Sequence, residues 1–265
     1  MTIDPVFVHD GERYHATDLA HGPWHEGALH GGAVAALLVH EIERHPAAPE
    51  LRLARLTCEF VRPVPSDGLA VTVAVARPGR RVTLLEASLR VGADVEVCRA
   101  RALLLAPSEI APTIVPEPDS PPPGPERGRA NDWRADGRRM FATDALEIRF
   151  VQGSFRAPGP STAWFRLRGP LVGDAPASPL ERVVAASDFG NGIASVLTWE
   201  EHLFINPELT VYIEREPVDE WIALQSRMRV ATGSVPMSES VLWDRGGRIG
   251  IALQSLIVGR LQRTG

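Results

Sequence analysis

Apolar and polar residues follow two different patterns along the chain. In several short segments they alternate, as at 69–79, where valine alternates with threonine and alanine. Such alternation predicts strands of an antiparallel sheet with one covered face. At 31–45 the pattern differs, because almost every position of the first turns is apolar. A helix that is apolar all round is buried, so the sequence predicts a central helix inside the fold.

The same order of elements is predicted twice. In the first half, a short hairpin over 5–18 precedes the helix, and four strands follow, over 52–64, 69–79, 80–92 and 95–106. In the second half, strands over 145–155 and 162–171 precede a helical region over 178–202, and four strands follow, over 208–216, 220–233, 235–247 and 248–261. This repetition predicts one structural unit used twice in the chain.

A proline-rich stretch separates the two halves. Eight prolines lie between Pro107 and Pro125, and the apolar periodicity stops there. Proline lacks a backbone N–H donor and is poorly accommodated in helices and sheets. We therefore expect an N-terminal domain over 1–106, an exposed linker over 107–139 and a C-terminal domain over 140–265.

Charge and composition narrow the class of protein. The chain of 265 residues has a formal net charge of −5, whereas nucleic-acid-binding domains are usually basic. No apolar run reaches the length of about 20 residues that a membrane-spanning helix needs, and the N-terminus lacks a signal-peptide pattern. We therefore expect a cytoplasmic protein that binds neither nucleic acid nor membrane.

The residue types that commonly hold metals form no consistent pattern. Seven of the eight histidines precede residue 46, at irregular spacing, and no cysteine joins them. The two cysteines, Cys58 and Cys98, lie in strand patterns and are expected to be reduced core residues. The sequence also lacks phosphate-binding glycine motifs and the Gly-x-Ser-x-Gly motif of serine hydrolases. We therefore expect neither a metal nor a cofactor.

Four short motifs, two in each half, add a family resemblance to this pattern. They are His30-Gly31-Gly32 before the apolar helix, Phe60-Val61-Arg62-Pro63 at a strand end, Ser187-Asp188-Phe189 in the helical region and Ala252-Leu253-Gln254-Ser255 in the last strand. Together with the repeated order of elements, they resemble the acyl-CoA thioesterase II family. The resemblance implies a double-hotdog fold, an α+β protein of two tandem hotdog domains. Each domain would be a long central helix wrapped by a curved antiparallel sheet.

The resemblance also implies a catalytic site in the second half. Asp188 matches the family's catalytic aspartate and Gln254 its glutamine, whereas the family's serine or threonine falls on Asn206. Thr210 lies nearby but fits the strand position less well. Since asparagine also donates and accepts hydrogen bonds, Asn206 and Gln254 would orient the water that Asp188 activates as a general base. We expect direct water attack without a covalent acyl-enzyme.

Substrate contacts are expected at two glycine-rich stretches and at arginines. Backbone N–H groups at a helix N-terminus stabilise a developing oxyanion, and glycine permits a close approach. Either Gly31-Gly32 or Gly190-Asn191-Gly192 offers such a stretch, and we expect substrate contacts at His30, Gly31, Gly32 and Gly190. The phosphates of coenzyme A would meet Arg62, with Arg80, Arg81 and Arg215 as further candidates, although surface arginines are usually solvated.

Each of these polar residues also has a purely structural interpretation. Asp188 can cap a second helix after a break, and Gln254 can be a buried amide bonded to the backbone. Asn206 precedes Pro207, as turn residues do, and His30 can cap or pack the first helix. The sequence leaves both interpretations open at each position.

Three functions are compatible with these features. The leading hypothesis is an acyl-CoA thioesterase that releases a free acid and coenzyme A. The alternative is an acyl-thioester-binding protein, inactive or weakly active because Asn206 replaces the hydroxyl. A hotdog enoyl-CoA hydratase or dehydratase is disfavoured, since such enzymes pair a carboxylate with a histidine and the first histidine after Asp188 is His202. Exposed sheet edges favour association, so we expect a homodimer or larger homo-oligomer.

Overall fold

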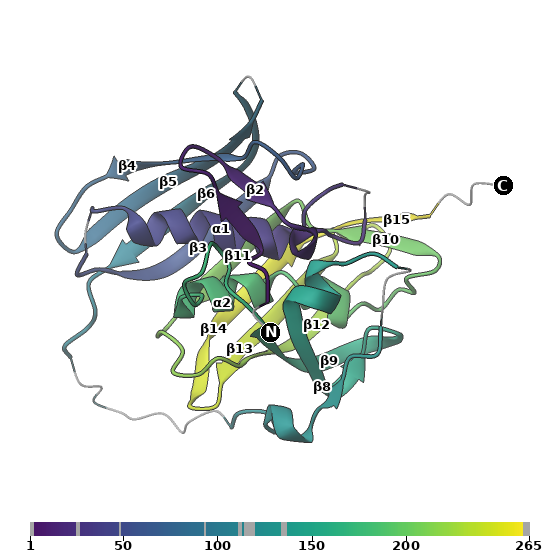
Figure 1. Cartoon of the computed structure of the whole chain (residues 1–265). Helices are drawn as coiled ribbons and strands as arrows, with labels where there is room; N and C mark the ends of the chain where they lie inside the picture. Colours follow the sequence, from purple (N-terminus) through teal and green to yellow (C-terminus); the bar gives the residue numbers. More distant parts are fainter. Residues whose placement is uncertain are drawn as a thin grey trace.

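The computed structural model describes residues 3–24, 27–47, 49–92, 94–110, 113, 120–133 and 137–261. It confirms an α+β architecture in which a large antiparallel sheet packs against a few helices (Figure 1). Parts of the expected linker, at 111–112, 114–119 and 134–136, lie outside the described residues. The domain boundaries stay predictions.

The N-terminal half is built around helix α1 (Gly31–Arg44). Every residue from Gly32 to Val39 is buried, as the all-round apolar pattern predicts. The predicted hairpin forms from β1 (Phe7–His9) and β2 (Tyr14–Ala16), and a 3-10 turn, η1 (Asp18–Ala20), follows it. The four predicted strands are β3 (Arg52–Phe60), β4 (Ala70–Arg77), β5 (Val82–Val91) and β6 (Val95–Leu105). Helix α1 lies along them (Figure 1).

The C-terminal half also has the predicted strands, together with short elements that the sequence pattern did not indicate. The strands of its sheet are β8 (Leu146–Ser154), β9 (Ala157–Leu167), β11 (Glu208–Ile213), β12 (Ile222–Arg229), β13 (Met237–Asp244) and β14 (Gly247–Ser255). The helices are α2 (Pro179–Ser187) and α3 (Gly190–Ile193), and one π-helical turn, η3 (Phe141–Ala145), precedes β8.

The expected single strand over 248–261 is wrong, because the chain leaves the sheet at Leu256. This side chain is buried against Phe204 and Met228 in a small separate cluster. The following strand, β15 (Ile257–Arg260), then pairs with β10 (His202–Ile205) instead of continuing the main sheet.

The two halves share one eleven-stranded sheet. The strand order is β4-β5-β6-β3-β11-β14-β13-β12-β9-β8-β7, so the halves meet where β3 pairs with β11, with Cys58 opposite Leu209. Helices α1 and α2 also contact each other directly. They run in opposite directions, because Gly32 meets the Ala185 backbone while His40 Nδ1 lies 2.7 Å from Glu181 Oε1. The N-terminus of α1 is thereby brought to the C-terminus of α2.

The last part of the expected linker contacts the C-terminal half. The short strand β7 (Arg129–Ala130) pairs with β8, and the 3-10 turn η2 (Pro125–Arg127) precedes it. The indole Nε1 of Trp164 donates a 2.7 Å hydrogen bond to the carbonyl oxygen of Pro123. Trp164 belongs to a buried cluster with Trp221 and Trp243, so this part of the chain lies over an aromatic surface of the sheet.

An ion pair between partly exposed Arg215 and buried Asp244 joins the loop after β11 to the end of β13. Both oxygens of Asp244 accept hydrogen bonds from Arg215, at 2.7 and 2.6 Å, and the backbone N–H groups of Val218 and Gly246 also donate to this carboxylate. Arg215, one of the candidates for contacting phosphates, is therefore committed to a structural pair. Burial raises the pKa of Asp244, but the hydrogen bonds from Arg215 and the backbone outweigh it and hold the pKa below its ordinary value of 3.8.

Replacing this carboxylate should destabilise the protein in a pH-dependent way. For Asp244→Asn we expect a loss of about 2 kcal/mol in the free energy of unfolding near neutral pH, since the buried carboxylate loses its charge-assisted hydrogen bonds while Arg215 stays partly solvated. Because the folded pKa is depressed, the contribution is fully present above about pH 4 and is lost as pH falls through the folded pKa. Urea unfolding between neutral pH and pH 3, with the exposed Asp174→Asn as control, measures the difference. Equal losses for both variants would contradict the prediction.

Candidate active site

The break between α2 and α3 positions the predicted catalytic aspartate. Ser178 and Glu181 form a capping box, and Pro179 occupies the first turn, so α2 begins where the sequence indicates. The helix ends at Ser187, and Asp188 follows as its C-cap residue. Of the two interpretations of Asp188, the one in which it caps a second helix is wrong, because Phe189 holds the N-cap position of α3.

Two amide side chains hold one oxygen of the Asp188 carboxylate. Asn206 Nδ2 donates a hydrogen bond of 2.7 Å to Oδ1, and Gln254 Nε2 lies 3.3 Å from the same atom. Asp188 is only 5% exposed, so these contacts replace most of its water. The three predicted catalytic residues, from α2, the segment before β11, and β14, are thus brought together in space.

Gln254 also links the carboxylate to the backbone around it. Its Nε2 donates to the Asp188 carbonyl oxygen at 3.1 Å, and its Oε1 accepts from the Asn191 N–H at 3.0 Å. The structural interpretation of Gln254, a buried amide bonded to backbone, is therefore correct, and it is compatible with contact to the carboxylate. Gln254 fixes both the turn that carries Asp188 and the start of α3.

Asn191 joins the same network, although sequence reasoning assigned no role to its side chain. Its Nδ2 donates to the Phe204 carbonyl oxygen at 3.1 Å and lies 3.5 Å from Asn206 Oδ1. Asn206 in turn donates to the Glu208 carbonyl oxygen at 3.2 Å. The only sequence signal for Asn191 is its place between two glycines. Thr210 lies elsewhere and contacts Thr57 and Glu208 on the sheet.

The second oxygen of Asp188 faces the N-terminus of α1. A Cβ atom built on Gly31 would lie only 2.7 Å from Oδ2 and 2.9 Å from the Phe60 ring. Only glycine allows the helix to approach the carboxylate this closely. The first N–H groups of an α-helix have no acceptor within the helix; here the Gly32 N–H is bonded to His30 Nδ1, which leaves the Gly31 N–H for an oxygen placed at this point.

His30 combines both roles considered for it. It is the N-cap residue of α1, where its Nδ1 accepts from the Gly32 N–H at 3.0 Å, and its ring stacks on Phe189 with centroids 4.5 Å apart. The same Nδ1 lies 3.1 Å from Asp188 Oδ2. Nδ1 has a single in-plane site, so it either accepts from the Gly32 N–H or, when it carries a proton, donates to Asp188. His30 and Asp188 form a pair that joins the two halves of the chain.

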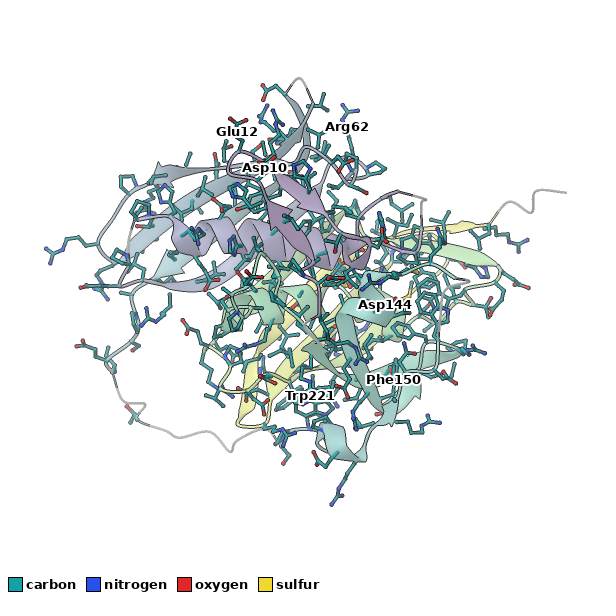
Figure 2. The ribbon with its side chains drawn as sticks, in the orientation of Figure 1. Asp10, Glu12, Arg62, Asp144, Phe150 and Trp221 are labelled. Atoms are coloured by element: carbon teal, nitrogen blue, oxygen red, sulfur yellow. The ribbon has the colours of Figure 1, made fainter. Side chains whose placement is uncertain are left out.

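These groups border one cavity of about 520 Å³. Five of the predicted site residues line it: His30, Gly31, Arg62, Asp188 and Asn206. Arg62 is exposed at the outer edge of the N-terminal half, where it can meet a charged part of a ligand (Figure 2). The remaining wall is mainly apolar and aromatic.

Three predicted site residues lie behind the cavity wall. Gln254 acts through Asp188 and Asn191, as described above. A Cβ atom on Gly32 would lie 2.5 Å from the Ala185 carbonyl oxygen, and one on Gly190 would lie 2.6 Å from Ser240 Oγ. Gly32 permits close packing of α1 on α2 and Gly190 permits close packing of α3 on the sheet, so we do not count their Cα atoms as substrate contacts.

Among the described residues, the cysteines and the potential metal ligands do not add a second site. Cys58 and Cys98 are buried and unpaired, and burial, followed by neighbouring negative charges, raises the pKa of both thiols. Neither thiol is therefore an activated nucleophile. Within the described parts of the chain, no three His, Cys, Asp or Glu side chains form a metal-binding group, and His25 lies outside those parts. No helix of the described residues has the length and apolar character needed to span a membrane.

Comparison with solved structures supports the fold. A putative thioesterase II from Thermobifida fusca YX is 19% identical, with a TM-score of 0.76 over 98% of this chain and 100% of its own. An acyl-CoA thioesterase II, TesB2, from Mycobacterium marinum is 18% identical, with a TM-score of 0.67 over 88% of this chain and 90% of its own. A conserved protein of unknown function with a hot dog fold from Alicyclobacillus acidocaldarius is 16% identical, with a TM-score of 0.69 over 97% of this chain and 96% of its own.

Comparison with sequence families identifies the chain. No curated protein sequence is detectably similar to it. The profile of the acyl-CoA thioesterase N-terminal domain matches residues 20–105, and that of the acyl-CoA thioesterase C-terminal domain matches residues 117–258. The two matches cover most of the chain and include every residue of the candidate site. The chain therefore belongs to the acyl-CoA thioesterase family and is a thioester hydrolase.

Proposed function

We propose that this enzyme hydrolyses an acyl-CoA to the free acid and coenzyme A by direct attack of water, with Asp188 as general base. The observation that carries the proposal is the Asp188 carboxylate. Oδ1 is held by Asn206 and Gln254, while Oδ2 faces the cavity beside the N-terminus of α1. A fixed carboxylate beside the N-terminus of a helix suits a reaction in which water loses a proton while a carbonyl oxygen gains negative charge.

The reaction steps follow from this arrangement. Water bound at Asp188 attacks the thioester carbon and transfers a proton to the carboxylate, which gives a tetrahedral oxyanion. The intermediate collapses with cleavage of the C–S bond, and the departing sulfur takes up the proton. Asp188 is thereby restored without any covalent bond to the enzyme. His30, at 3.1 Å from Oδ2, positions the carboxylate and is not the base itself.

The N-terminus of α1 is the better supported of the two candidate oxyanion sites. Gly31 lines the cavity, and the helix behind it has 14 residues. Each helix has one early N–H group already bonded, Gly32 to His30 Nδ1 and Asn191 to Gln254 Oε1, but α3 has only four residues. We assign the oxyanion contact to the Gly31 N–H at the start of α1, where the helix dipole adds positive potential.

The tandem domains, the cellular compartment and the oligomeric state belong to the same proposal. The sheet joins a four-stranded N-terminal part to the C-terminal part through the β3–β11 pair, which supports two tandem hotdog domains. The unpaired thiols of Cys58 and Cys98 are compatible with the cytoplasm.

The open edge strand β4 supports a homodimer or larger homo-oligomer. Light scattering that gives only the 28.8 kDa monomer at micromolar concentration would refute the assembly.

One observation favours a second function, the hydration of an enoyl-CoA. The sequence argument against it, the lack of a nearby histidine after Asp188, does not hold, because His30 from the other half contacts Asp188. A carboxylate and an imidazole at one cavity could add water across a carbon–carbon double bond. The acyl-CoA thioesterase family match favours thioester hydrolysis over this alternative.

One substrate panel separates the candidate functions. We would follow free thiol release from octanoyl-CoA, palmitoyl-CoA and phenylacetyl-CoA, and both thiol release and loss of enoyl absorbance from crotonyl-CoA. We expect thiol release from at least one saturated or aryl substrate and retained enoyl absorbance. Loss of enoyl absorbance without thiol release would establish the hydratase instead. Saturable binding with neither change would establish the acyl-thioester-binding protein.

A further inference from the structure

One wall of the cavity is built from four aromatic side chains, which we call the aromatic wall: Trp24, Trp133, Phe155 and Trp199. Trp24 and Trp199 stack at a centroid distance of 4.8 Å with 14° between the ring planes. Trp133 lies 6.4 Å from Trp199 at 27°, and 5.9 Å from Phe155. The rings form a continuous aromatic surface rather than isolated contacts.

The four rings come from four separate connecting segments. Trp24 precedes α1, Trp133 lies between β7 and η3, Phe155 lies between β8 and β9, and Trp199 lies between α3 and β10. All four are only half-buried. Leaving several large rings partly in water at a cavity is unfavourable, since each ring gains free energy from being covered. The convergence of four loops on one surface therefore indicates a ligand that covers it.

The aromatic wall lies next to the proposed catalytic residues. Gly192, one helical turn after Asp188, also lines the cavity. A Cβ atom at Gly192 would lie 3.6 Å from Trp199 Cζ2 and 3.7 Å from Phe155 Cε1. Asp188 and its amide partners thus lie at the start of the short helix α3, and the aromatic wall lies against the third residue of that helix, Gly192. A group attached to a carbonyl held at Asp188 reaches the wall directly.

The charges at the cavity rim distinguish the acyl end of the ligand from the phosphates of coenzyme A. Next to the wall, Arg156 follows Phe155 and Glu200 follows Trp199, so the two charges balance. At the end of β3, Arg62 lines the rim without an acidic residue among the neighbouring lining positions 60–64. Phosphates are better matched by Arg62, which leaves the aromatic wall to the acyl group.

We propose that the aromatic wall selects acyl groups that end in a planar aromatic ring, so that the preferred substrates are aryl- or arylalkyl-CoA thioesters. This inference rests on the proposed function, because it takes the Asp188 side of the cavity as the place of the thioester. Ring-on-ring contact rewards a flat acyl group more than a saturated one of the same size. Trp199, which contacts the other rings of the wall, is the main specificity-determining residue.

The test compares phenylacetyl-CoA with cyclohexylacetyl-CoA, which differ in ring flatness and not in length. We expect kcat/KM to favour the aryl substrate by about 3- to 10-fold in the wild-type enzyme. Trp199→Leu and Phe155→Leu should abolish the preference, and Trp199→Phe should keep part of it. Tyr212→Leu, which removes an exposed aromatic ring outside the cavity, is the matched control. Equal kcat/KM for both substrates in the wild type would overturn the proposal.

Binding measurements separate this proposal from the proposed function. The non-hydrolysable thioether analogues of both substrates, and free coenzyme A, would be titrated calorimetrically against wild type and the two leucine variants. Aryl preference that the variants lose supports the wall even if no thioester is hydrolysed, in which case only the proposed function fails. If Trp199→Leu weakens the binding of free coenzyme A as much as that of the aryl analogue, the aromatic wall stacks on the adenine and the proposal is wrong. Absence of binding by either analogue overturns it as well.

Discussion

Asp188→Asn should reduce kcat for acyl-CoA hydrolysis by about 10²- to 10⁴-fold, the usual contribution of a positioned general base. The amide oxygen of the new side chain can still accept from Asn206 and Gln254, so the surrounding hydrogen bonds remain possible. The base is lost because an amide does not take up a proton from water. We therefore expect substrate affinity and thermal stability to stay close to those of the wild type.

Free thiol release under single-turnover conditions measures the loss of the chemical step, and the binding of a thioether analogue measures the substrate affinity. Asp174→Asn is the control, because Asp174 is exposed and does not line the cavity. Retention of wild-type kcat in Asp188→Asn would remove Asp188 from the mechanism. A parallel loss of binding and folding would instead assign it a structural role.

Gly31→Ala should reduce kcat/KM by about 10²-fold, because small displacements at a reacting centre have effects of this size. The added Cβ would lie 2.7 Å from Asp188 Oδ2 and 2.9 Å from Phe60, in the space between the carboxylate and the helix N–H groups. It would push the thioester carbonyl away from its donors. Helix propensity favours alanine and the clash falls on two side chains rather than on backbone, so Gly31→Ala should cost less stability than Gly32→Ala.

Two other glycines provide the comparison for this variant. At Gly259 a Cβ would make only ordinary contacts of 3.7 Å with Leu203, so Gly259→Ala should leave kcat/KM unchanged. At Gly32 it would lie 2.5 Å from the Ala185 carbonyl oxygen, so Gly32→Ala should mainly lower the unfolding temperature. Unchanged kcat/KM in Gly31→Ala would show that the oxyanion is not held at this helix.

Much of the fold follows from local sequence signals. The all-round apolar run that begins at Gly31 indicates the buried helix, and Ser178-Pro179 with Glu181 indicates the start of α2. Alternation indicates the strands that follow each helix. The sequence allows a break in the second helix but does not identify the residue that caps α3, because Phe189 has no capping side chain. The departure of the chain at Leu256 has no local signal, since the burial of this side chain depends on Phe204 and Met228.

The sequence by itself determined the secondary-structure order, the glycines that open the first helix and, through family resemblance, the candidates Asp188, Asn206 and Gln254. These depend on periodicity and short motifs, which are properties of neighbouring residues. Only the tertiary structure decided that His30 meets Asp188 across the two halves and that four loops bring Trp24, Trp133, Phe155 and Trp199 to one wall. Contacts between residues so far apart in the chain depend on the antiparallel crossing of α1 and α2 and on the β3–β11 pairing, which no local pattern encodes.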